Sequence, residues 1–349
     1  MDLEQYINEI KSSNISIKES CQKRFDNIAK PLNGLGELER LVAKMAAALE
    51  DVDVDINNKR VVVCCSDNGV VECGVSQSDS SVTLNIARSL VNGTSSVCVM
   101  AQHIGADVRP VNLGMYEHID GMDDIRVVAG CGNICKGPAM SREAAIEAVI
   151  AGINEVKKAK NEGVKIIATG EVGIGNTTTA AAVATVLLDR PAYEMVGRGA
   201  GLSDQGLDCK INAVNKAIEI NGPEASDIID VVSKVGGADI AGMIGIFIGG
   251  AYYHIPIIMD GVISAVAALC AVRLNHNVID YIIPSHMSSE KAMTYICDEL
   301  GLAPVIHGDF HLGEGTGAVA MFSLLDIALT VYRRAAKFDD IGVEQYIKQ

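Results

Sequence analysis

The chain has 349 residues, 49% of them apolar, and a formal net charge of −15 at pH 7. This size suffices for one large core, or for a core with a small accessory domain, since single cores stop growing at about 250 to 300 residues. A strongly negative chain without a basic patch argues against a nucleic-acid partner. The ten cysteines form no CxxC pair and no regular spacing, which indicates reduced thiols. With no secretory segment at its start, we expect a soluble, cytoplasmic enzyme.

Hydrophobic periodicity divides the chain into an α/β middle and two helical ends. Residues 1–12 and 34–49 show helical spacing, and the other end, from about residue 326, is also helical in pattern. Between them, short Val/Ile runs alternate with alanine-rich helices, and we expect strands at residues 61–65, 107–113, 125–129, 164–168 and 253–259. Such alternation predicts a Rossmann-like α/β fold, a parallel sheet with helices on both faces.

The longest uncharged apolar run, residues 240–259, is nearly long enough to span a membrane. It contains several glycines and His254, and its flanks are polar. We therefore expect a buried helix followed by a strand, and no membrane association.

Two glycine-rich turns each carry a carboxylate. The turn at Gly313–Gly317 places Glu314 directly before an apolar helix over residues 318–334, where Glu314 could serve as a general base or only cap the helix. The turn over residues 170–179 contains Glu171 and lies between an expected strand and a helix over residues 180–188. This order of elements is how α/β proteins build a cradle for an anion.

A third glycine cluster, residues 197–201, has Arg198 between glycines and is followed by Lys210. None of the turns has the Gly-Lys-Ser/Thr of a Walker loop or the glycine spacing of a dinucleotide fold, which disfavours nucleotide triphosphates and NAD. Three such turns suggest one substrate that contains both a phosphate and a sugar.

With these motifs the chain resembles the nicotinate-nucleotide:dimethylbenzimidazole phosphoribosyltransferases, which make the lower-ligand nucleotide of cobalamin and related cobamides. The similarity extends nearly end to end and depends on the order and spacing of its motifs, which lie at residues 30–36, 67–70, 74–76, 137–140, 170–178, 197–201, 236–241, 260–264, 285–288 and 312–318.

The resemblance implies attack by a ring nitrogen of a benzimidazole on C1′ of nicotinate mononucleotide, with release of nicotinate. Positioning and removal of one proton then suffice, so no metal and no cofactor is expected. It also implies that residues 1–58 and 326–349 pack together as a small helical domain beside a catalytic domain of residues 59–325. The protein is expected to act as a homodimer, or as a heterodimer with a homologous subunit.

Roles follow from matching positions in the family pattern. Glu314 is the expected general base, and the expected acceptor site contains Ser76, Leu84, Val172 and Leu312. The residues expected to bind nicotinate mononucleotide and its phosphate are Glu171, Gly173, Gly175, Asn176, Thr177, Thr178, Gly199, Gly201, Lys210 and Ser288. By position alone Glu171 could be a helix cap, Lys210 a surface lysine and Arg198 a structural arginine. His286 is expected to be a hydrogen-bonded structural group, and Asp260 to cap the helix that follows it.

The chain departs from the family pattern where the base binds. Leu84 stands eight residues after Ser76, where the family commonly has a glutamine, so the pocket is more apolar. Asn68, Val172 and Met287 also differ from the usual residues. Three hypotheses remain: transfer to benzimidazoles, transfer to phenol or p-cresol as in a branch of the family that works as paired subunits, or a binding paralogue without activity. Retention of Glu314 argues against the third.

Overall fold

A computed structural model, which describes residues 1–199 and 201–346, contains a six-stranded sheet in the order β3-β2-β1-β4-β5-β6. Every neighbouring pair of strands is parallel. The strands are β1 (Lys59–Ser66), β2 (Ala106–Gly114), β3 (Asp123–Asp124), β4 (Ile166–Val172), β5 (Ile257–Met259) and β6 (Ile282–Pro284). The predicted α/β class with a parallel sheet is confirmed.

The central strand β1 explains why both faces of the sheet are covered. All eight of its residues are buried, and successive side chains of a strand point to opposite faces. Val62 and Cys64 accordingly join one apolar cluster, whereas Val61, Val63 and Cys65 join another. A strand that is apolar on both faces can be stable only between two layers of helices.

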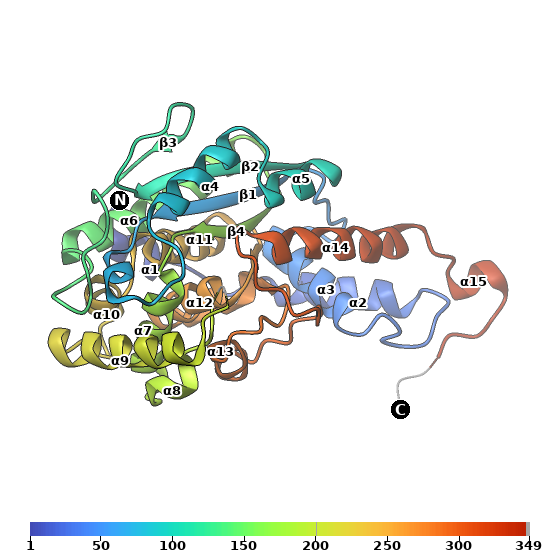
Figure 1. Cartoon of the computed structure of the whole chain (residues 1–349). Helices are drawn as coiled ribbons and strands as arrows, with labels where there is room; N and C mark the ends of the chain where they lie inside the picture. Colours follow the sequence, from blue (N-terminus) through green and yellow to red (C-terminus); the bar gives the residue numbers. More distant parts are fainter. Residues whose placement is uncertain (200, 347–349) are drawn as a thin grey trace.

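Helices supply both layers (Figure 1). On one face lie α11 (Ala238–Tyr253) and α12 (Val262–Leu274), and α6 (Arg142–Asn161) packs across α11. The other face is covered by α4 (Ser81–Val91), α5 (Ser96–His103) and α14 (Thr316–Arg334). The expectation of helices on both faces is therefore confirmed.

The apolar run 240–259 forms the buried helix α11 and then β5, as predicted. Its glycines admit α6: a Cβ on Gly245 would overlap the carbonyl oxygen of Val149, and one on Gly152 of α6 would overlap that of Gly242. Among the described residues, one helix, α14, has the length and apolarity of a membrane span, and 56% of that window is buried within the protein.

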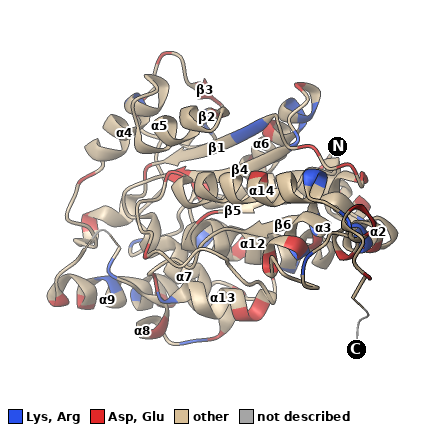
Figure 2. Ribbon diagram, turned by 90° about the vertical axis from the view of Figure 1, so that its right-hand side faces the viewer, with Lys and Arg blue, Asp and Glu red and all other residues tan. Residues whose placement is uncertain are grey.

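The remaining helices surround these layers or extend from them. They are α1 (Leu3–Glu9), α2 (Ile15–Asp26), α3 (Glu37–Leu49), α7 (Asn176–Leu188), α8 (Ala192–Met195), α9 (Asp204–Asn221), α10 (Ile228–Val235), α13 (Ala292–Leu300), α15 (Phe338–Ile341) and the 3₁₀ helices η1 (Gly69–Cys73) and η2 (His276–Tyr281). Figure 2 shows that charged residues gather on peripheral helices such as α2, α9 and α13, and that few lie in the strands.

Two predicted strands differ from the structure. The segment after β3 still runs beside β2, with Ile125 N donating to Asn112 O at 3.1 Å and Val127 N to Leu113 O at 2.9 Å, but the regular strand ends at Asp124. Residues 253–259 enter the sheet only at Ile257, because α11 continues to Tyr253. The three-residue strand β6 was not predicted, since it is too short to show a pattern.

The two chain ends meet in a narrower lobe formed by α2, α3, α15 and the distal half of α14 (Figure 1). Ala29 N donates to Ala336 O at 2.9 Å, and the Arg24 guanidinium lies 4.3 Å from the centre of the Tyr332 ring. In contrast, α1 packs against α6 and α11, and the expected boundary between residues 325 and 326 falls inside α14. The division of the chain into two domains stays a prediction.

Candidate active site

A cavity lies beyond the carboxyl ends of β4, β5 and β6, near the point between β1 and β4 where the strand order reverses. Ligands of parallel α/β sheets bind at such points. The predicted residues that the structure brings together around this cavity are Ser76, Glu171, Val172, Gly173, Gly175, Asn176, Thr177, Gly199, Lys210, Ser288, Leu312 and Glu314.

Glu314 is presented by an unusual backbone turn. Gly313, Glu314 and Gly315 all have left-handed φ angles, of 88°, 60° and 95°, and Thr316 begins α14 immediately afterwards. A glutamate is uncommon in this region, and such strain persists only where the surroundings impose it. The half-buried carboxylate accepts a hydrogen bond from the N–H of Val97 in α5, at 3.3 Å.

The two carboxylate-bearing turns contact each other directly. A Cβ on Gly170, in β4, would overlap the carbonyl oxygen of Glu314. A Cβ on Gly313 would in turn lie 2.6 Å from Oε1 of Glu171. The glycines therefore let two segments far apart in sequence interlock, and they bring both carboxylates to one cavity.

Glu171 differs electrostatically from Glu314. Burial raises the pKa of Glu171 well above its ordinary value, and Asp239, Asp260 and Glu314 nearby raise it further. The Nδ2 of Asn176, the first residue of α7, donates to Glu171 Oε2. Glu171 is thus suited to stay protonated, and to donate a hydrogen bond, at a pH where an ordinary carboxyl group is charged.

Asp260 holds the start of α14 rather than the helix that follows it in sequence, so the capping prediction for α12 needs correction. Its Oδ1 accepts a hydrogen bond from Ala318 N at 2.8 Å. Burial raises the Asp260 pKa to about 7, and backbone N–H groups partly oppose this shift. Because Ala318 lies four residues beyond Glu314, Asp260 also fixes the Glu314 turn.

His286, which follows β6, agrees with its expected structural role. Its Nδ1 lies 3.0 Å from the Ser285 hydroxyl, and the side chain is buried. Burial lowers the His286 pKa to about 4, so the ring is neutral near pH 7.

Lys210 is not a surface lysine. It is 0% exposed, and its Nζ donates to Thr177 Oγ1 at 2.7 Å. Burial lowers the pKa of Lys210 to about 8. A Cβ on Gly199 would lie 3.4 Å from this Nζ, so the turn at Gly199 and the first turn of α7 flank one cation.

Arg198 also lines the cavity, but its guanidinium is engaged within its own loop. Its guanidinium donates to Leu202 O at 2.8 Å and to Asp204 Oδ1 at 2.5 Å. These contacts are those of a structural arginine.

Within the part of the chain that the structure describes, three of the predicted site residues do not line the cavity. Leu84 packs against the apolar cluster beneath α4, while Ile86 of the same helix lines the cavity. Thr178 is fully buried inside α7. The carbonyl oxygen of Gly201 accepts from Gln77 Nε2 at 2.5 Å, and it is Gln77 that reaches the lining.

Several lining residues are not among the predicted ones, for example Glu290, Phe310 and His311. Glu290 Oε1 accepts a hydrogen bond from Gly199 N at 2.8 Å. The nearby motif at residues 285–288 was the one signal that pointed to this segment.

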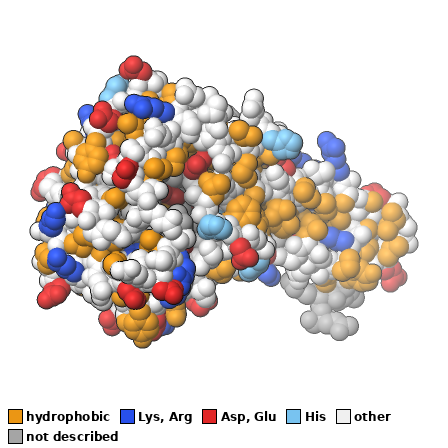
Figure 3. Space-filling model, viewed as in Figure 1, with side chains coloured by type: hydrophobic (Ala, Val, Ile, Leu, Met, Phe, Trp, Pro, Cys, Tyr) orange, Lys and Arg blue, Asp and Glu red, His pale blue; other side chains and the backbone are white. Residues whose placement is uncertain are grey.

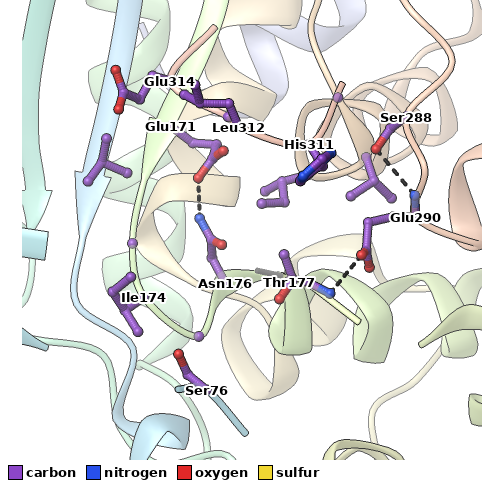
Figure 4. A pocket seen from close by; sticks show the side chains of 18 of the residues that line it. Ser76, Glu171, Ile174, Asn176, Thr177, Ser288, Glu290, His311, Leu312 and Glu314 are labelled. Carbon is purple, nitrogen blue, oxygen red and sulfur yellow. Dashed lines mark hydrogen bonds between the residues drawn. The ribbon is translucent and has the colours of Figure 1, made fainter. Parts of the chain in front are cut away.

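The cavity has two chemically distinct ends (Figure 4). Glu314 and Leu312 lie at one end, whereas Thr177, Ser288 and Glu290 lie at the other, and Glu171 and Asn176 are between them. A ligand that spans the cavity would therefore meet the ammonium group of Lys210, beside Thr177 and Glu290, at one end and the carboxylate of Glu314 at the other.

The family model described as "Phosphoribosyltransferase" matches residues 10–343 of the chain. The nicotinate-nucleotide–dimethylbenzimidazole phosphoribosyltransferase of Acetivibrio thermocellus is 46% identical over 330 residues, 94% of each chain. The enzyme of the same name from Ruminiclostridium cellulolyticum is 43% identical over 348 residues, 99% of each chain. The crystal structure of CobT from Thermus thermophilus superimposes with a TM-score of 0.89 at 31% identity, covering 95% of this chain and 100% of that one. The chain therefore belongs to this family of phosphoribosyltransferase enzymes.

Proposed function

We propose that the protein transfers the phosphoribosyl group of nicotinate mononucleotide to dimethylbenzimidazole or a related aromatic base. The products are nicotinate and an α-ribosyl base 5′-phosphate for cobamide synthesis. The observation that carries this proposal is the two-ended cavity, with the buried Lys210 at one end and Glu314 at the other. The printed names of the relatives support the choice of substrates.

In the proposed reaction, the bond between C1′ and the pyridinium nitrogen of the donor breaks, and its electrons neutralise the leaving nicotinate ring. A ring nitrogen of the base forms the new bond to C1′, and the proton on its other nitrogen passes to Glu314. The donor is already activated, so the protein needs only to align the partners and accept this proton. A protonated Glu171 would donate a hydrogen bond to substrate between the two ends.

The 5′-phosphate is assigned to the end formed by Lys210, Thr177 and the N–H of Gly199. Lys210 supplies a charge that water screens little, because the side chain is buried. Of the other predicted donor-binding residues, Ser288 lies at this same end, whereas Glu171 and Asn176 lie between it and Glu314. The aromatic acceptor is assigned to the side of Leu312, Val172 and Ser76.

The test is to incubate purified protein with nicotinate mononucleotide and each of dimethylbenzimidazole, benzimidazole and adenine, and to detect products by mass. We expect nicotinate and the ribosyl base phosphate to form in equal amounts. Hydrolysis of the donor without a new glycosidic bond would contradict the proposal. Protein that binds the donor and turns nothing over, alone or with a homologous subunit, would favour a binding paralogue.

A second candidate is transfer to the oxygen of phenol or p-cresol. It is favoured by the apolar lining at Val75, Ile86 and Val172, because a phenol needs only one polar contact. Adding phenol and p-cresol to the same panel tests it. Efficient use of benzimidazoles with no phenolic product would exclude this candidate.

We further propose that the working unit is a cytoplasmic dimer, either of two copies or with a homologous subunit. Apolar side chains gather on the surface of the narrower lobe (Figure 3), where Ile327 and Ile341 are 59% and 55% exposed. Exposed apolar surface of this kind favours association. Light scattering during gel filtration should give twice the mass of one chain, and a monomer at all concentrations would contradict the homodimer.

A further inference from the structure

Glu290 lies at the end of the cavity to which the phosphate is assigned. Its Oε1 accepts a hydrogen bond from the N–H of Gly199 at 2.8 Å. Its Oε2 lies so close to Gly197 that a Cβ there would overlap the carboxylate. The φ angle of Gly197 is not left-handed, so the glycine is explained by the close approach of Glu290 rather than by backbone conformation.

This carboxylate also balances the buried cation. Lys210 Nζ lies beneath the same turn, 3.4 Å from Gly197 O and 2.7 Å from Thr177 Oγ1. The negative charge of Glu290 raises the Lys210 pKa against the opposing effect of burial. Glu290 is therefore the acidic group that faces Lys210 at this end of the cavity.

A phosphate bound here would compete with Glu290 for one donor. The Gly199 N–H can make one strong hydrogen bond, and two anions a few ångströms apart repel each other. Glu290 lies in the connection between β6 and α13, where its own N–H is 3.4 Å from Ser288 Oγ.

We propose that Glu290 is a resident anion: it occupies the phosphate end of the cavity and yields the Gly199 N–H to the 5′-phosphate of the donor. The inference depends on the proposed function, because it assumes that this end binds a phosphate. Exchanging one anion for another keeps Lys210 paired at each stage, and return of the carboxylate assists release of the phosphorylated product. Glu290 is thus a positioning residue. It weakens binding of the phosphate and speeds release of the product.

The test uses Glu290→Gln, which keeps the shape and one oxygen acceptor for Gly199 while removing the charge. Titration calorimetry with inorganic phosphate and with ribose 5-phosphate should show both ligands binding more tightly to Glu290→Gln than to the wild type, on the order of ten-fold. Binding of uncharged ribose should not change. Asp298→Asn, an exposed position in α13, makes the same change in net charge and should bind all three probes like the wild type.

Thermal melting of each variant checks its fold, and Glu290→Ala provides a second variant that should also bind phosphate more tightly. Weaker phosphate binding to folded Glu290→Gln would make Glu290 a support for the Gly199 turn and overturn the proposal. Weaker ribose 5-phosphate binding with unchanged inorganic phosphate would make it a ligand of the sugar, with the same consequence.

The same titrations separate this inference from the proposed function. If Lys210→Ala abolishes phosphate binding but Glu290→Gln does not improve it, only the role of Glu290 is wrong. If the wild type binds neither phosphate nor ribose 5-phosphate and Lys210→Ala has normal kinetics, the phosphate end itself is wrong, and this inference is lost with it.

Discussion

Glu314 combines a side chain suited to proton transfer with a backbone conformation that glutamate seldom adopts. A left-handed φ costs a non-glycine residue on the order of 1 to 3 kcal/mol, and here it is imposed by glycines on both sides and by the hydrogen bond from Val97. A residue that only capped α14 would gain nothing from this strain. The geometry at this one position is therefore the reason to treat Glu314 as the reacting carboxylate.

Glu314→Gln should lower turnover by about two to four orders of magnitude, as loss of a general base usually does. The amide can still accept the hydrogen bond from Val97, so the melting temperature should stay near that of the wild type. Steady-state kinetics with nicotinate mononucleotide and dimethylbenzimidazole measure the effect, and Glu117→Gln at an exposed position is the matched control. Nearly normal turnover in folded Glu314→Gln would exclude this role.

Lys210 should make donor binding depend on pH. Its pKa is lowered to about 8 by burial, and only the protonated amine attracts a phosphate. As the pH rises through about 8, the free protein loses this charge, so the Michaelis constant for nicotinate mononucleotide should rise while kcat changes less. Measurements from about pH 6.5 to about 9.5 test this, a range that brackets the lowered pKa. Lys210→Ala should bind the donor weakly at every pH, without the inflection, and a flat wild-type profile would contradict the assignment.

Among the elements, β4 and α14 build the site together, because the end of one is interlocked with the turn that begins the other. Gly170 has an ordinary φ, so an alanine there is resisted by the backbone of Glu314 and Gly315 rather than by its own conformation. The contact between these two backbones thus determines where the carboxylate lies in the cavity.

Gly170→Ala should therefore displace the Glu314 turn and lower kcat by on the order of 100-fold, the cost of an error of about 1 Å in alignment. Overpacking of this kind also lowers the free energy of unfolding by about 1 to 3 kcal/mol. Gly137→Ala is the control, since a Cβ there meets open space at an ordinary φ. It should change neither kcat nor the free energy of unfolding. Normal kinetics in Gly170→Ala would mean that the turn adapts without moving the base.

Sequence patterns predicted those elements whose apolar residues form a long, uninterrupted or regularly spaced run. Strand β1 and helix α11 were recognised because uninterrupted apolar runs need cover on all sides, and the glycine turns because backbone approach demands glycine. Which face of α4 meets the cavity depends on the rotation of the helix, so Leu84 was placed there although Ile86 lines it. Glu290 could not be predicted, since its partner Gly199 is remote in sequence.

At the scale of the whole molecule, the buried carboxyl groups around the cavity oppose folding when they are charged. Burial raises the pKa values of Asp239 and Asp260 to about 6 and about 7, and raises that of Glu171 well above its ordinary range. Between about pH 4 and 7 the folded protein then binds more protons than the unfolded chain, so these groups reduce the free energy of unfolding as the pH rises.

The substitution Asp239→Asn tests whether a buried carboxyl group lowers the free energy of unfolding as the pH rises. Asparagine removes a charge at a position that is 0% exposed, so the variant should gain more stability relative to the wild type at about pH 8 than at about pH 5. Urea unfolding at both pH values measures the difference, with the exposed substitution Asp208→Asn as the control. An equal effect at the two pH values would show that Asp239 keeps the same charge throughout this range.

The strand order has a consequence for biosynthesis. The middle strand β1 comes early in the chain and pairs with β2 and β4, but the turn that completes the cavity, at Gly313–Gly315, follows all six strands and so leaves the ribosome after them. A nascent chain can assemble most of the sheet while still lacking Glu314 and the N-terminus of α14. Substrates stabilise only a protein whose cavity is complete. They therefore cannot guide the pairing of the strands, and the order of pairing depends on the sequence alone.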